Sequence, residues 1–284
     1  MKLIKRKACP FCQKNHFKSL FKINYSSKNM TEFLINYYKN NNVCEILKAE
    51  EYEISECLHC SGSFQTNIPN EKLSLYLYEI LISSDESFKK KKKLSVKQFK
   101  EYFNDAEIIE KIIKKKSHEI KILEFGCGWG FWANFMKSMN FDIETVEISN
   151  PRKKYLDKIN IRNYENIDKI DNKYDLIFSN QALEHISEPF ETLSALKGKL
   201  NDNGVMYHKF PSTFFFKNKL FKNYTPRKDC AHPLEHINLI NKNCFKKMSE
   251  LLNLKKVKIK ELNFINKVKL IKNNFIFNNI ILRK

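Results

Sequence analysis

The sequence lacks any apolar run long enough to cross a membrane. Residues 275–282 form a short apolar stretch that Asn278 and Asn279 interrupt, whereas a spanning helix needs about 20 apolar residues. The N-terminal residues also lack the charged start and apolar core that mark a secretory signal. We therefore expect a cytoplasmic protein with no membrane span.

Arginine is scarce as well. The 284 residues carry a formal net charge of +19, from 51 Lys and Arg against 32 Asp and Glu, but only five of the basic residues are Arg. Arg is the better ligand for phosphates and base edges because its guanidinium forms a planar fork. Lys, Asn and Ile are abundant throughout, so we interpret the charge as a compositional bias and the Lys run 89–93 as solvated. Nucleic acid is disfavoured as a partner, although the charge keeps it as an alternative.

Four of the eight cysteines form two closely spaced pairs, Cys9-x-x-Cys12 and Cys57-x-x-Cys60. In a cytoplasmic protein, cysteines favour metal binding or buried thiols over disulfides. Four thiolates in two such pairs suit tetrahedral zinc with a Zn–S distance of about 2.3 Å. All four coordination positions would be filled by the protein, which predicts a structural zinc ion rather than a catalytic one.

Other interpretations of this cysteine-rich segment are weaker. A redox pair needs one Cys-x-x-Cys motif inside a strand–helix unit, and no such unit is visible here. His16 and His59 lie near the pairs, and either could replace one cysteine as a ligand. The other cysteines are expected to be ordinary thiols: Cys44, Cys127, Cys230 and Cys244.

Strand-like and helix-like segments alternate in the later part of the chain. We expect strands at residues 120–125, 141–148, 160–164, 174–179 and 205–210, with helices between them and near 241–252. Such alternation predicts a parallel sheet covered by helices. Two late strands, near 256–261 and 275–282, have no helix between them and predict an antiparallel edge hairpin. The expected fold is α/β: a Rossmann-like, seven-stranded, mostly parallel sheet with a small N-terminal zinc-binding module.

The sequence divides into three regions along its length. Residues 1–82 form the predicted zinc module, which we expect to be largely irregular. Residues 83–105 are predicted to hold a Ser- and Lys-rich linker and the start of a connecting helix, because apolar residues recur at helical spacing from 94 to 116. Residues 106–284 form the predicted Rossmann-like domain.

A glycine-rich turn follows the first strand of the predicted sheet. Gly126, Gly128 and Gly130 are spaced Gly-x-Gly-x-Gly, which differs from the dinucleotide fingerprint Gly-x-Gly-x-x-Gly. Ligands of such folds bind at the carboxyl ends of the strands, where bare glycine backbone allows close approach. This turn is therefore the candidate ligand site.

Two acidic residues accompany the turn. Glu124 stands two positions before the first glycine, where a carboxylate would repel a pyrophosphate and attract a cationic head group. Glu147 ends the second strand, where a carboxylate can accept hydrogen bonds from both ribose hydroxyls. Together they favour a nucleoside with a cationic head group over a dinucleotide.

These residues resemble the class I methyltransferases that use S-adenosylmethionine (SAM), in the small-molecule branch. The resemblance rests on residues 124–130, on Glu147 with Ile148, and on residues 174–186, and it extends from about residue 94 to the C-terminus. It implies SAM as the cofactor, held by Glu124, Gly126, Cys127, Gly128, Gly130, Glu147, Ile148, Asn180 and Gln181.

The resemblance also implies a role for each part of this set. The loop of Gly126, Cys127 and Gly128 would hold the methionine part, and Glu147 the ribose. Residues near Tyr164 and Glu165 would flank the adenine, while Asn180 and Gln181 would line the sulfonium side. A similar cysteine-rich module precedes the methyltransferase domain in some sugar-modifying members of the family.

Histidines are the candidates on the acceptor side, because a hydroxyl acceptor is helped by a general base of near-neutral pKa. His185 follows the fourth strand, and the alternative is that Glu184 and His185 only cap the next helix. His236 belongs to the stretch His232-Pro-Leu-Glu-His236, which resembles a histidine-containing stretch of these methyltransferases. It either lines the acceptor pocket or packs its loop. His208, on a strand, is predicted to be a core or rim residue.

The predicted function is SAM-dependent methylation of a small polar acceptor such as a sugar or nucleotide-sugar. The residues Asn180-Gln-Ala-Leu depart from the Asn/Asp-Pro-Pro-aromatic motif of amino-methylating nucleic-acid enzymes, and a Pro-Cys for attack on a pyrimidine is missing at that place. A methyltransferase of RNA or protein, supported by charge and zinc, stays an alternative. So does a non-catalytic SAM-binding adaptor. The sequence does not indicate the oligomeric state.

Overall fold

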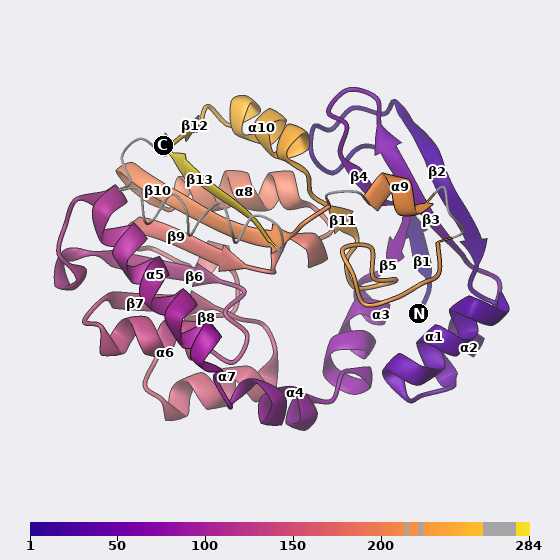
Figure 1. Ribbon diagram of the computed structural model, residues 1–284, viewed down its shortest axis with the longest axis horizontal. Helices are drawn as coiled ribbons and strands as arrows, with labels where there is room; N and C mark the ends of the chain where they lie inside the picture. The colour runs from indigo at the N-terminus through magenta and orange to yellow at the C-terminus, as the bar shows by residue number, and fades with distance from the viewer. Residues whose placement is uncertain (214–215, 221–223, 258–276) are drawn as a thin grey trace. The chain divides into compact units, whose positions relative to one another are not determined.

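The computed structural model describes residues 1–213, 216–220, 224–257 and 277–284, and it divides into two compact units (Figure 1). Unit 1 comprises residues 1–83, 183–190 and 211–251; unit 2 comprises residues 84–182, 191–210 and 252–284. The chain thus enters unit 1 three times. Compact units need not coincide with domains, and the linear division with breaks after residues 82 and 105 stays a prediction.

Seven strands of unit 2 form one sheet in the order β12-β13-β10-β9-β6-β7-β8. Their bounds are β6 Lys121–Phe125, β7 Asp142–Val146, β8 Asn163–Tyr164, β9 Tyr174–Asn180, β10 Leu200–Pro211, β12 Lys255–Lys256 and β13 Phe277–Arg283. The strands from β10 to β8 pair in parallel, and β12 pairs with β13 antiparallel. The predicted mostly parallel sheet with an antiparallel edge is confirmed. Residues 258–261 and 275–276 of the predicted hairpin lie outside the described residues.

The helices of unit 2 precede or connect these strands. They are α4 Ser84–Lys91, α5 Val96–Ile113, η2 Ser117–Glu119, α6 Phe131–Ser138, α7 Asn150–Lys158, η3 Ile167–Lys169 and most of α8 Pro189–Gly198. A capping box begins α5: Gln98 N donates to Ser95 Oγ at 3.2 Å, and Ser95 N donates to Gln98 Oε1 at 3.0 Å. The segment predicted as a polar linker contains α4, so that part of the chain is more ordered than its composition indicates.

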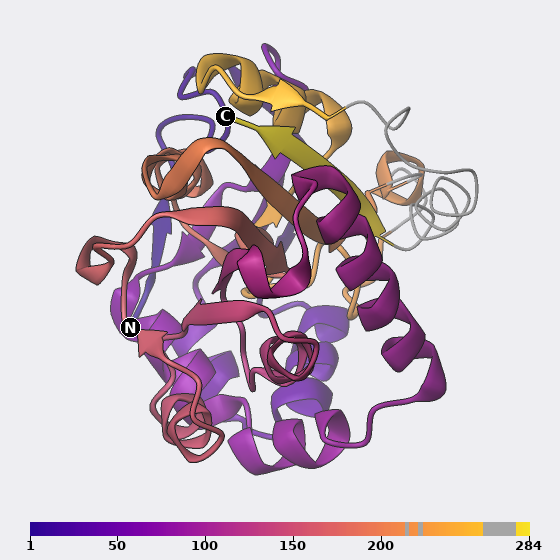
Figure 2. The same ribbon diagram turned by 90° about the vertical axis from the view of Figure 1, so that its left-hand side faces the viewer.

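One face of the sheet is covered by α5 and α6, which lie side by side in Figures 1 and 2. Ile109 of α5, Trp132 of α6 and Leu156 of α7 join Ile122 and Leu176 of the sheet in one buried apolar cluster. The Trp132 and Phe178 rings stack with centroids 3.9 Å apart. This cluster fixes the carboxyl ends of β6 and β9, where the strand order reverses and ligands of such folds bind.

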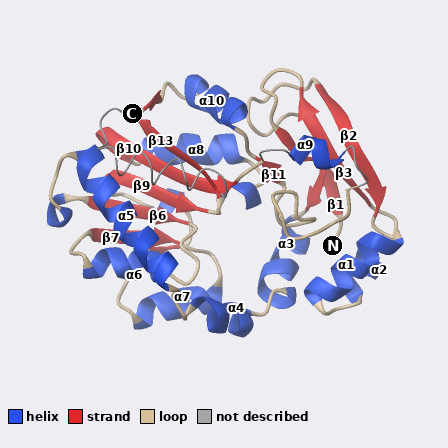
Figure 3. Cartoon of the chain, viewed as in Figure 1, coloured by secondary structure: helices blue, strands red, loops and turns tan. Residues whose placement is uncertain are grey.

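Unit 1 contains two antiparallel sheets, whose strands are red in Figure 3. One sheet pairs β1 Leu3–Lys5 with β5 Asn67–Pro69; the other has the order β11-β4-β3-β2, from β11 Asn238–Leu239, β4 Ser63–Gln65, β3 Glu51–Cys57 and β2 Phe17–Asn24. The helices are α1 Lys28–Tyr38, α2 Asn42–Leu47, α3 Glu71–Tyr76, η1 Leu77–Leu81, η4 Leu183–His185, α9 Phe216–Leu220 and α10 Lys242–Leu251.

The expectation that the first eighty residues are largely irregular was therefore wrong. In β3 the buried side chains of Tyr52 and Ile54 alternate with partly exposed acidic ones, so a strand of the usual period is present but short. In β2 every side chain is at least partly exposed, which removes the strong apolar alternation that would mark a strand.

A buried ion pair joins α5 to β10. Lys209 Nζ lies 2.6 Å from both carboxylate oxygens of Asp105, and these side chains belong to residues only 9% and 3% exposed. Trp132 Nε1 and Tyr207 Oη also donate to Asp105, at 3.1 Å and 3.3 Å. Every polar atom of this carboxylate is thus satisfied, as a buried charge requires.

Among the described helices, none is long and apolar enough to cross a membrane.

We expect Lys209→Met to lower stability by about 3 kcal/mol, because breaking a buried pair from one side leaves the other charge uncompensated. For a chain of this size that corresponds to a fall in Tm of roughly 10 °C. The double variant Asp105→Asn/Lys209→Met should be more stable than Lys209→Met, since the asparagine keeps an acceptor for Trp132 without the charge. Thermal denaturation monitored by circular dichroism measures both. A double variant that is no more stable than Lys209→Met would contradict this account.

Candidate functional site

The glycine turn between β6 and α6 adopts a left-handed backbone at all three glycines. The φ angles of Gly126, Gly128 and Gly130 are +70°, +60° and +66°, values that favour glycine because it has no Cβ. The backbone N–H groups of Gly126 and Cys127 donate to Val146 O at 2.9 Å and 3.4 Å. These bonds hold the turn against the end of β7.

The three glycines serve different purposes. A Cβ at Gly126 would lie 2.7 Å from the Cβ of Ala182, and one at Gly130 would lie 2.4 Å from Cδ2 of Leu156. Both positions are therefore closed by packing. A Cβ at Gly128 would meet no atom within 4 Å. Only Gly128 of the three leaves open space over its backbone, which is what close approach of a ligand needs.

Glu124 lies at the end of β6 with its carboxyl group buried. The residue is 4% exposed, and its Oε2 has no hydrogen-bond partner among the described residues. Burial, chiefly, raises the pKa of Glu124 well above its usual value, and the carboxylates of Glu147 and Asp105 add to the shift. A nearby cation would favour the charged carboxylate and so oppose this upward shift of the pKa. The position therefore suits the ammonium group of a ligand better than an anion.

Glu147 follows β7 and is anchored by backbone donors. Its Oε2 accepts from Gly128 N at 2.9 Å, and its Oε1 accepts from the N–H groups of Ile148 and Ser149 at 3.0 Å and 2.9 Å. Arg152 Nη1 lies 3.5 Å from Oε2. The side chain of Ile148 is 68% exposed. The carboxylate is thus held beside Gly128, the glycine with open space.

Trp129, within the glycine turn, contacts α4, and sequence reasoning missed this contact. Its Nε1 donates to Ser87 Oγ at 3.2 Å, and its ring lies 4.8 Å from that of Phe88. Phe88 also contacts Tyr155 of α7 at 4.9 Å. In the sequence, only Phe88, a single aromatic residue before the Lys run, hints at this contact. One such residue is too weak a signal to predict a helix that packs on the glycine turn.

The remaining predicted cofactor residues lie at the ends of β9 and β8. Asn180 and Gln181 are exposed, and Gln181 N donates to Lys209 O at 2.8 Å. The hydroxyl of Tyr164 donates to Glu144 Oε2 at 3.3 Å. Glu165 is exposed and pairs with lysines, which lower its pKa to about 2. The roles of these residues toward a cofactor stay predictions.

In unit 1, both candidate bases present a defined imidazole tautomer. His185 Nδ1 lies 2.9 Å from Glu235 O and 3.0 Å from Tyr78 Oη, and His236 Nδ1 lies within hydrogen-bond distance of Asp229 O. A carbonyl oxygen can only accept, so each Nδ1 carries the proton. When the ring is neutral, the lone pair of each imidazole is therefore on Nε2, the nitrogen that takes up a proton.

The two rings lie together, with centroids 4.9 Å apart. Burial, together with neighbouring His232, lowers the pKa of His236 to about 4, so this ring is neutral at physiological pH. His232 is buried and packs against the ring of Tyr37 at 4.4 Å. The structure thus brings His185 and His236 together, and the buried ring of His232 lies beside them.

Glu184 joins this cluster, which sequence reasoning placed only as a helix cap. It is 1% exposed, both of its carboxyl oxygens have no hydrogen-bond partner among the described residues, and burial raises its pKa to about 8. Its carboxyl group and one nitrogen of each of His185 and His236 lie within 4.8 Å of one another. At neutral pH a mostly protonated carboxyl group therefore lies beside the neutral imidazole of His236 and the ring of His185. His208, by contrast, is buried in β10 and contacts Ser179 Oγ at 2.7 Å.

The family model described as "Methyltransferase domain" matches residues 97–259, which is more than half of the chain. The chain belongs to this methyltransferase family. This match and the Rossmann-like sheet confirm the prediction of a SAM-dependent methyltransferase. No curated protein sequence matches the chain.

Solved structures of low sequence identity share the fold of this methyltransferase. The plantazolicin methyltransferase BpumL, in complex with a pentazolic desmethylPZN analog and SAH, is 13% identical, with a TM-score of 0.55 over 74% of this chain and 93% of its own. BamL, in complex with a triazolic analog and SAH, is 10% identical, with a TM-score of 0.51 over 74% and 93%.

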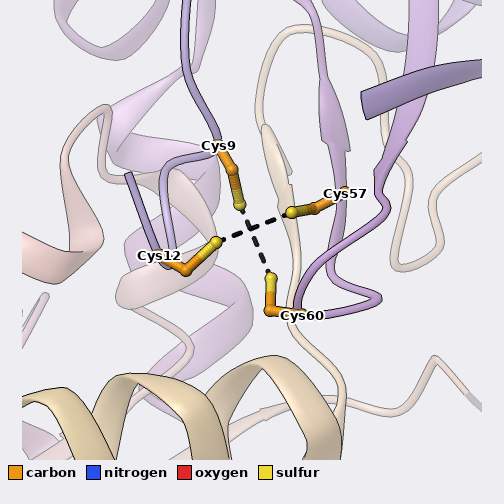
Figure 4. A group of neighbouring side chains, drawn as sticks. All are labelled: Cys9, Cys12, Cys57 and Cys60. Atoms are coloured by element: carbon orange, nitrogen blue, oxygen red, sulfur yellow. Dashed lines mark hydrogen bonds between the residues drawn. The ribbon is translucent and has the colours of Figure 1, made fainter. Parts of the chain in front are cut away.

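The four paired cysteines of this methyltransferase converge in unit 1 (Figure 4). The Sγ atoms of Cys9 and Cys60 lie 3.6 Å apart, as do those of Cys12 and Cys57. A disulfide requires about 2.05 Å, whereas four sulfurs about 2.3 Å from a tetrahedral metal lie about 3.8 Å apart. All four cysteines are buried, and all are free thiols. Their spacing fits a tetrahedral metal ion.

The backbone around the two cysteine pairs repeats the same turn. Gln13 N donates to Cys9 O at 2.9 Å, and Ser61 N donates to Cys57 O at 3.0 Å. Gln13 and Ser61, each directly after a pair, have φ angles of 61° and 57°. Two matching turns that point four sulfurs at one centre form a site built for a shared ligand.

The environment of Cys57 favours its thiolate. Burial acts to raise the pKa of Cys57, but backbone N–H groups of Cys60 and His59 outweigh it, and the pKa lies below its usual value. His59 N donates to Cys57 Sγ at 3.4 Å. A thiolate is the form that binds metal, and these donors favour it at Cys57, whereas a hydrogen bond with Cys60 together with burial raises the pKa of Cys9 and burial raises that of Cys12.

We expect Gly128→Val to abolish binding of S-adenosylhomocysteine. The loss of stability should be little more than the cost of placing a side chain on a left-handed backbone, about 1–2 kcal/mol. The valine side chain enters the open space over the turn without striking another residue. Gly130→Ala is the matched control, because its Cβ meets Leu156 and costs stability at a packed position. Isothermal titration calorimetry and Tm separate the two effects. Wild-type affinity in Gly128→Val would show that the ligand does not approach this backbone.

The raised pKa of Glu184 predicts a pH-dependent stability. A folded-state pKa of about 8 against an unfolded value near 4.5 means that the native state binds more protons between these limits. The carboxyl group therefore contributes stability at pH 5 that is lost as the pH rises through 8. The Tm of Glu184→Gln should rise relative to wild type over this range, then level off. Exposed Glu191→Gln is the control, and a parallel course of all three proteins would contradict the assignment.

Proposed function

We propose that this methyltransferase transfers the methyl group of SAM to a small polar acceptor, and that a histidine of the His185–His236 pair takes the proton of an acceptor hydroxyl. The observation that carries the donor half is the buried carboxyl group of Glu124 with its unpaired oxygen, close to the open backbone of Gly128 in the glycine turn. The Nδ1 hydrogen bonds of His185 and His236 to backbone carbonyls support the acceptor half, because they make Nε2 the proton acceptor of each ring in its neutral form.

The glycine turn and its flanking acids fit each part of SAM. Glu124 would accept hydrogen bonds from the ammonium of the methionine part, beside the backbone of Gly126, Cys127 and Gly128. Glu147, next to exposed Ile148, would accept from the ribose hydroxyls. Gly130 begins α6 and keeps the turn closed against it. Asn180 and Gln181, exposed at the carboxyl end of β9, would line the sulfonium side. A bound SAM supplies a methyl group that its sulfonium already activates.

The residues of the histidine cluster position and deprotonate the acceptor in this proposal. Because the sulfonium is a good leaving group, most of the catalytic task is to hold the nucleophile in line. The Nε2 of His236 or His185 accepts the hydroxyl proton, since each ring holds its Nδ1 proton against a backbone carbonyl. Three residues separate Gln181 of the donor site from His185 in the sequence.

Cys9, Cys12, Cys57 and Cys60 would hold a structural zinc ion. The matching turns, the sulfur spacing and the burial of all four cysteines support this. Four protein ligands leave no position for water, so the metal would stabilise the fold of unit 1 and take no part in methyl transfer. A reducing, cytoplasmic location suits such a site and remains part of the proposal.

We expect His236→Ala or His185→Ala to lower kcat by roughly 10²–10⁴-fold, the usual contribution of a general base, while the dissociation constant for SAM stays unchanged. Exposed His118→Ala is the matched control. The assay measures S-adenosylhomocysteine release with a panel of sugars and nucleotide-sugars. If both variants keep wild-type activity, the base is elsewhere.

The alternatives give different results in the same assay. An RNA methyltransferase would release S-adenosylhomocysteine with RNA, and its RNA affinity would fall steeply with salt. A non-catalytic adaptor would bind SAM but show no turnover with any acceptor, and neither histidine variant would change a measured property.

A further inference from the structure

Among the described residues, two groups of side chains lie close enough together to hold a metal ion: the four paired cysteines, and Glu184 with His185 and His236. In the second group, one carboxyl oxygen and one nitrogen of each ring lie within 4.8 Å of one another. Ligand atoms at about 2.1 Å from a tetrahedral zinc ion are about 3.4 Å apart. The three side chains are therefore within reach of a single ion after a small inward shift.

Glu184 lacks a partner that the described protein does not supply. The residue is 1% exposed, and neither of its carboxyl oxygens has a hydrogen-bond partner among the described residues. Buried polar groups are normally hydrogen-bonded, as Asp105 of unit 2 is by Lys209, Trp132 and Tyr207. A cation between the carboxyl group and the two rings would supply the partner that Glu184 lacks.

Both histidines are oriented in the way that metal-binding histidines usually are. His185 Nδ1 lies 2.9 Å from Glu235 O, and His236 Nδ1 lies within hydrogen-bond distance of Asp229 O. A metal-binding histidine almost always donates its other ring N–H to a carbonyl or carboxylate, which fixes the ring. Both rings are partly exposed, which gives an ion a route to the buried carboxyl group beside them.

The two chain segments that carry these side chains are tied together. Asn238, at the start of β11, donates through Nδ2 to Leu183 O at 2.9 Å and to Ile186 O at 2.6 Å. These two carbonyls stand on either side of the candidate ligands in η4, and Asn238 itself follows His236 by two residues. One amide group thus holds η4 against the segment that contributes the third ligand, so the group is organised before any ion binds.

We propose that Glu184, His185 and His236 bind a divalent transition-metal ion such as zinc, and that the open coordination position of this ion takes the hydroxyl of the acceptor. Two histidines and one glutamate form a ligand set of catalytic zinc sites, in which the fourth position stays open. The role toward the acceptor rests on the proposed function. In the metal-bound protein the rings serve as ligands through Nε2, and the ion takes over the task that the proposed function gives to a ring nitrogen.

The chemistry of this role needs no further reactant. A hydroxyl bound to the ion loses its proton to solvent water more easily, as metal-bound water does. The oxygen then attacks the methyl carbon of SAM. A carbon–oxygen bond forms while the methyl–sulfur bond breaks, and its electron pair stays on the sulfur, which gives S-adenosylhomocysteine and the methylated acceptor.

The test uses cobalt(II) as the probe in the full chain, because its absorption distinguishes the two candidate sites. Four thiolates give intense sulfur-to-cobalt bands in the near ultraviolet, whereas nitrogen and oxygen ligands give weaker visible bands. We expect wild type to bind two ions. Glu184→Gln and His236→Gln should keep the thiolate bands but bind the second ion more than about 10–100-fold more weakly, the effect of removing even an outer-shell partner. Exposed His118→Ala is the control and should match wild type.

Two results would overturn the site: wild type that binds no ion outside the thiolate bands, or a second ion that binds equally well to wild type, Glu184→Gln and His236→Gln. A turnover assay then tests the role of the ion. Brief treatment with a chelator should remove the ion from the open site first, and turnover should fall by at least about tenfold. Equal turnover with and without this ion would overturn its role toward the acceptor. A second ion bound as expected but no turnover in either form is a distinct result, which supports the metal site and counts against the proposed function.

Discussion

A charged group buried away from water is costly unless another group pairs with it, and buried charged groups of this kind occur in both units of the protein. Asp105 and Lys209 meet this requirement within the chain, at 2.6 Å and with two further donors to the carboxylate, and they join α5 to β10. Glu124 does not meet it: one oxygen of its buried carboxyl group is left without a partner among the described residues. We propose that the ammonium group of a bound ligand supplies the partner that Glu124 lacks within the protein.

The same reasoning connects the other unpaired groups to chemistry. Glu184, buried with a raised pKa of about 8, lies in the cluster of His185 and His236, where we propose that the proton of an acceptor hydroxyl is taken up. The donor turn and the histidine cluster thus each hold a buried carboxyl group with at least one oxygen that has no hydrogen-bond partner among the described residues.

Sequence reasoning predicted the sheet correctly because its signal is local. The apolar strands β6 and β9 are read from adjacent residues, and the sheet follows from the alternation of strands and helices. The glycine spacing and the acids Glu124 and Glu147 are also local signals, and their roles toward a cofactor stay predictions. It failed where the cause is distant or weak. Asp105 and Lys209 are separated by 104 residues, so no pattern predicts their pairing. The half-exposed strand β2 and the Lys-rich α4 lack a strong apolar face. The burial of Glu184 depends on packing that the sequence does not display.

The most direct test of the central claim is the affinity of SAM for wild type and for Glu124→Gln, measured by isothermal titration calorimetry. Glutamine keeps the size of the side chain but cannot provide the charge that an ammonium requires. A hydrogen bond to a charged group contributes about 1.5–3 kcal/mol, so we predict that wild type binds SAM and that Glu124→Gln binds it at least about tenfold more weakly, with an unchanged or higher Tm. Equal affinity in the two proteins, or no binding of SAM by wild type, would contradict the account.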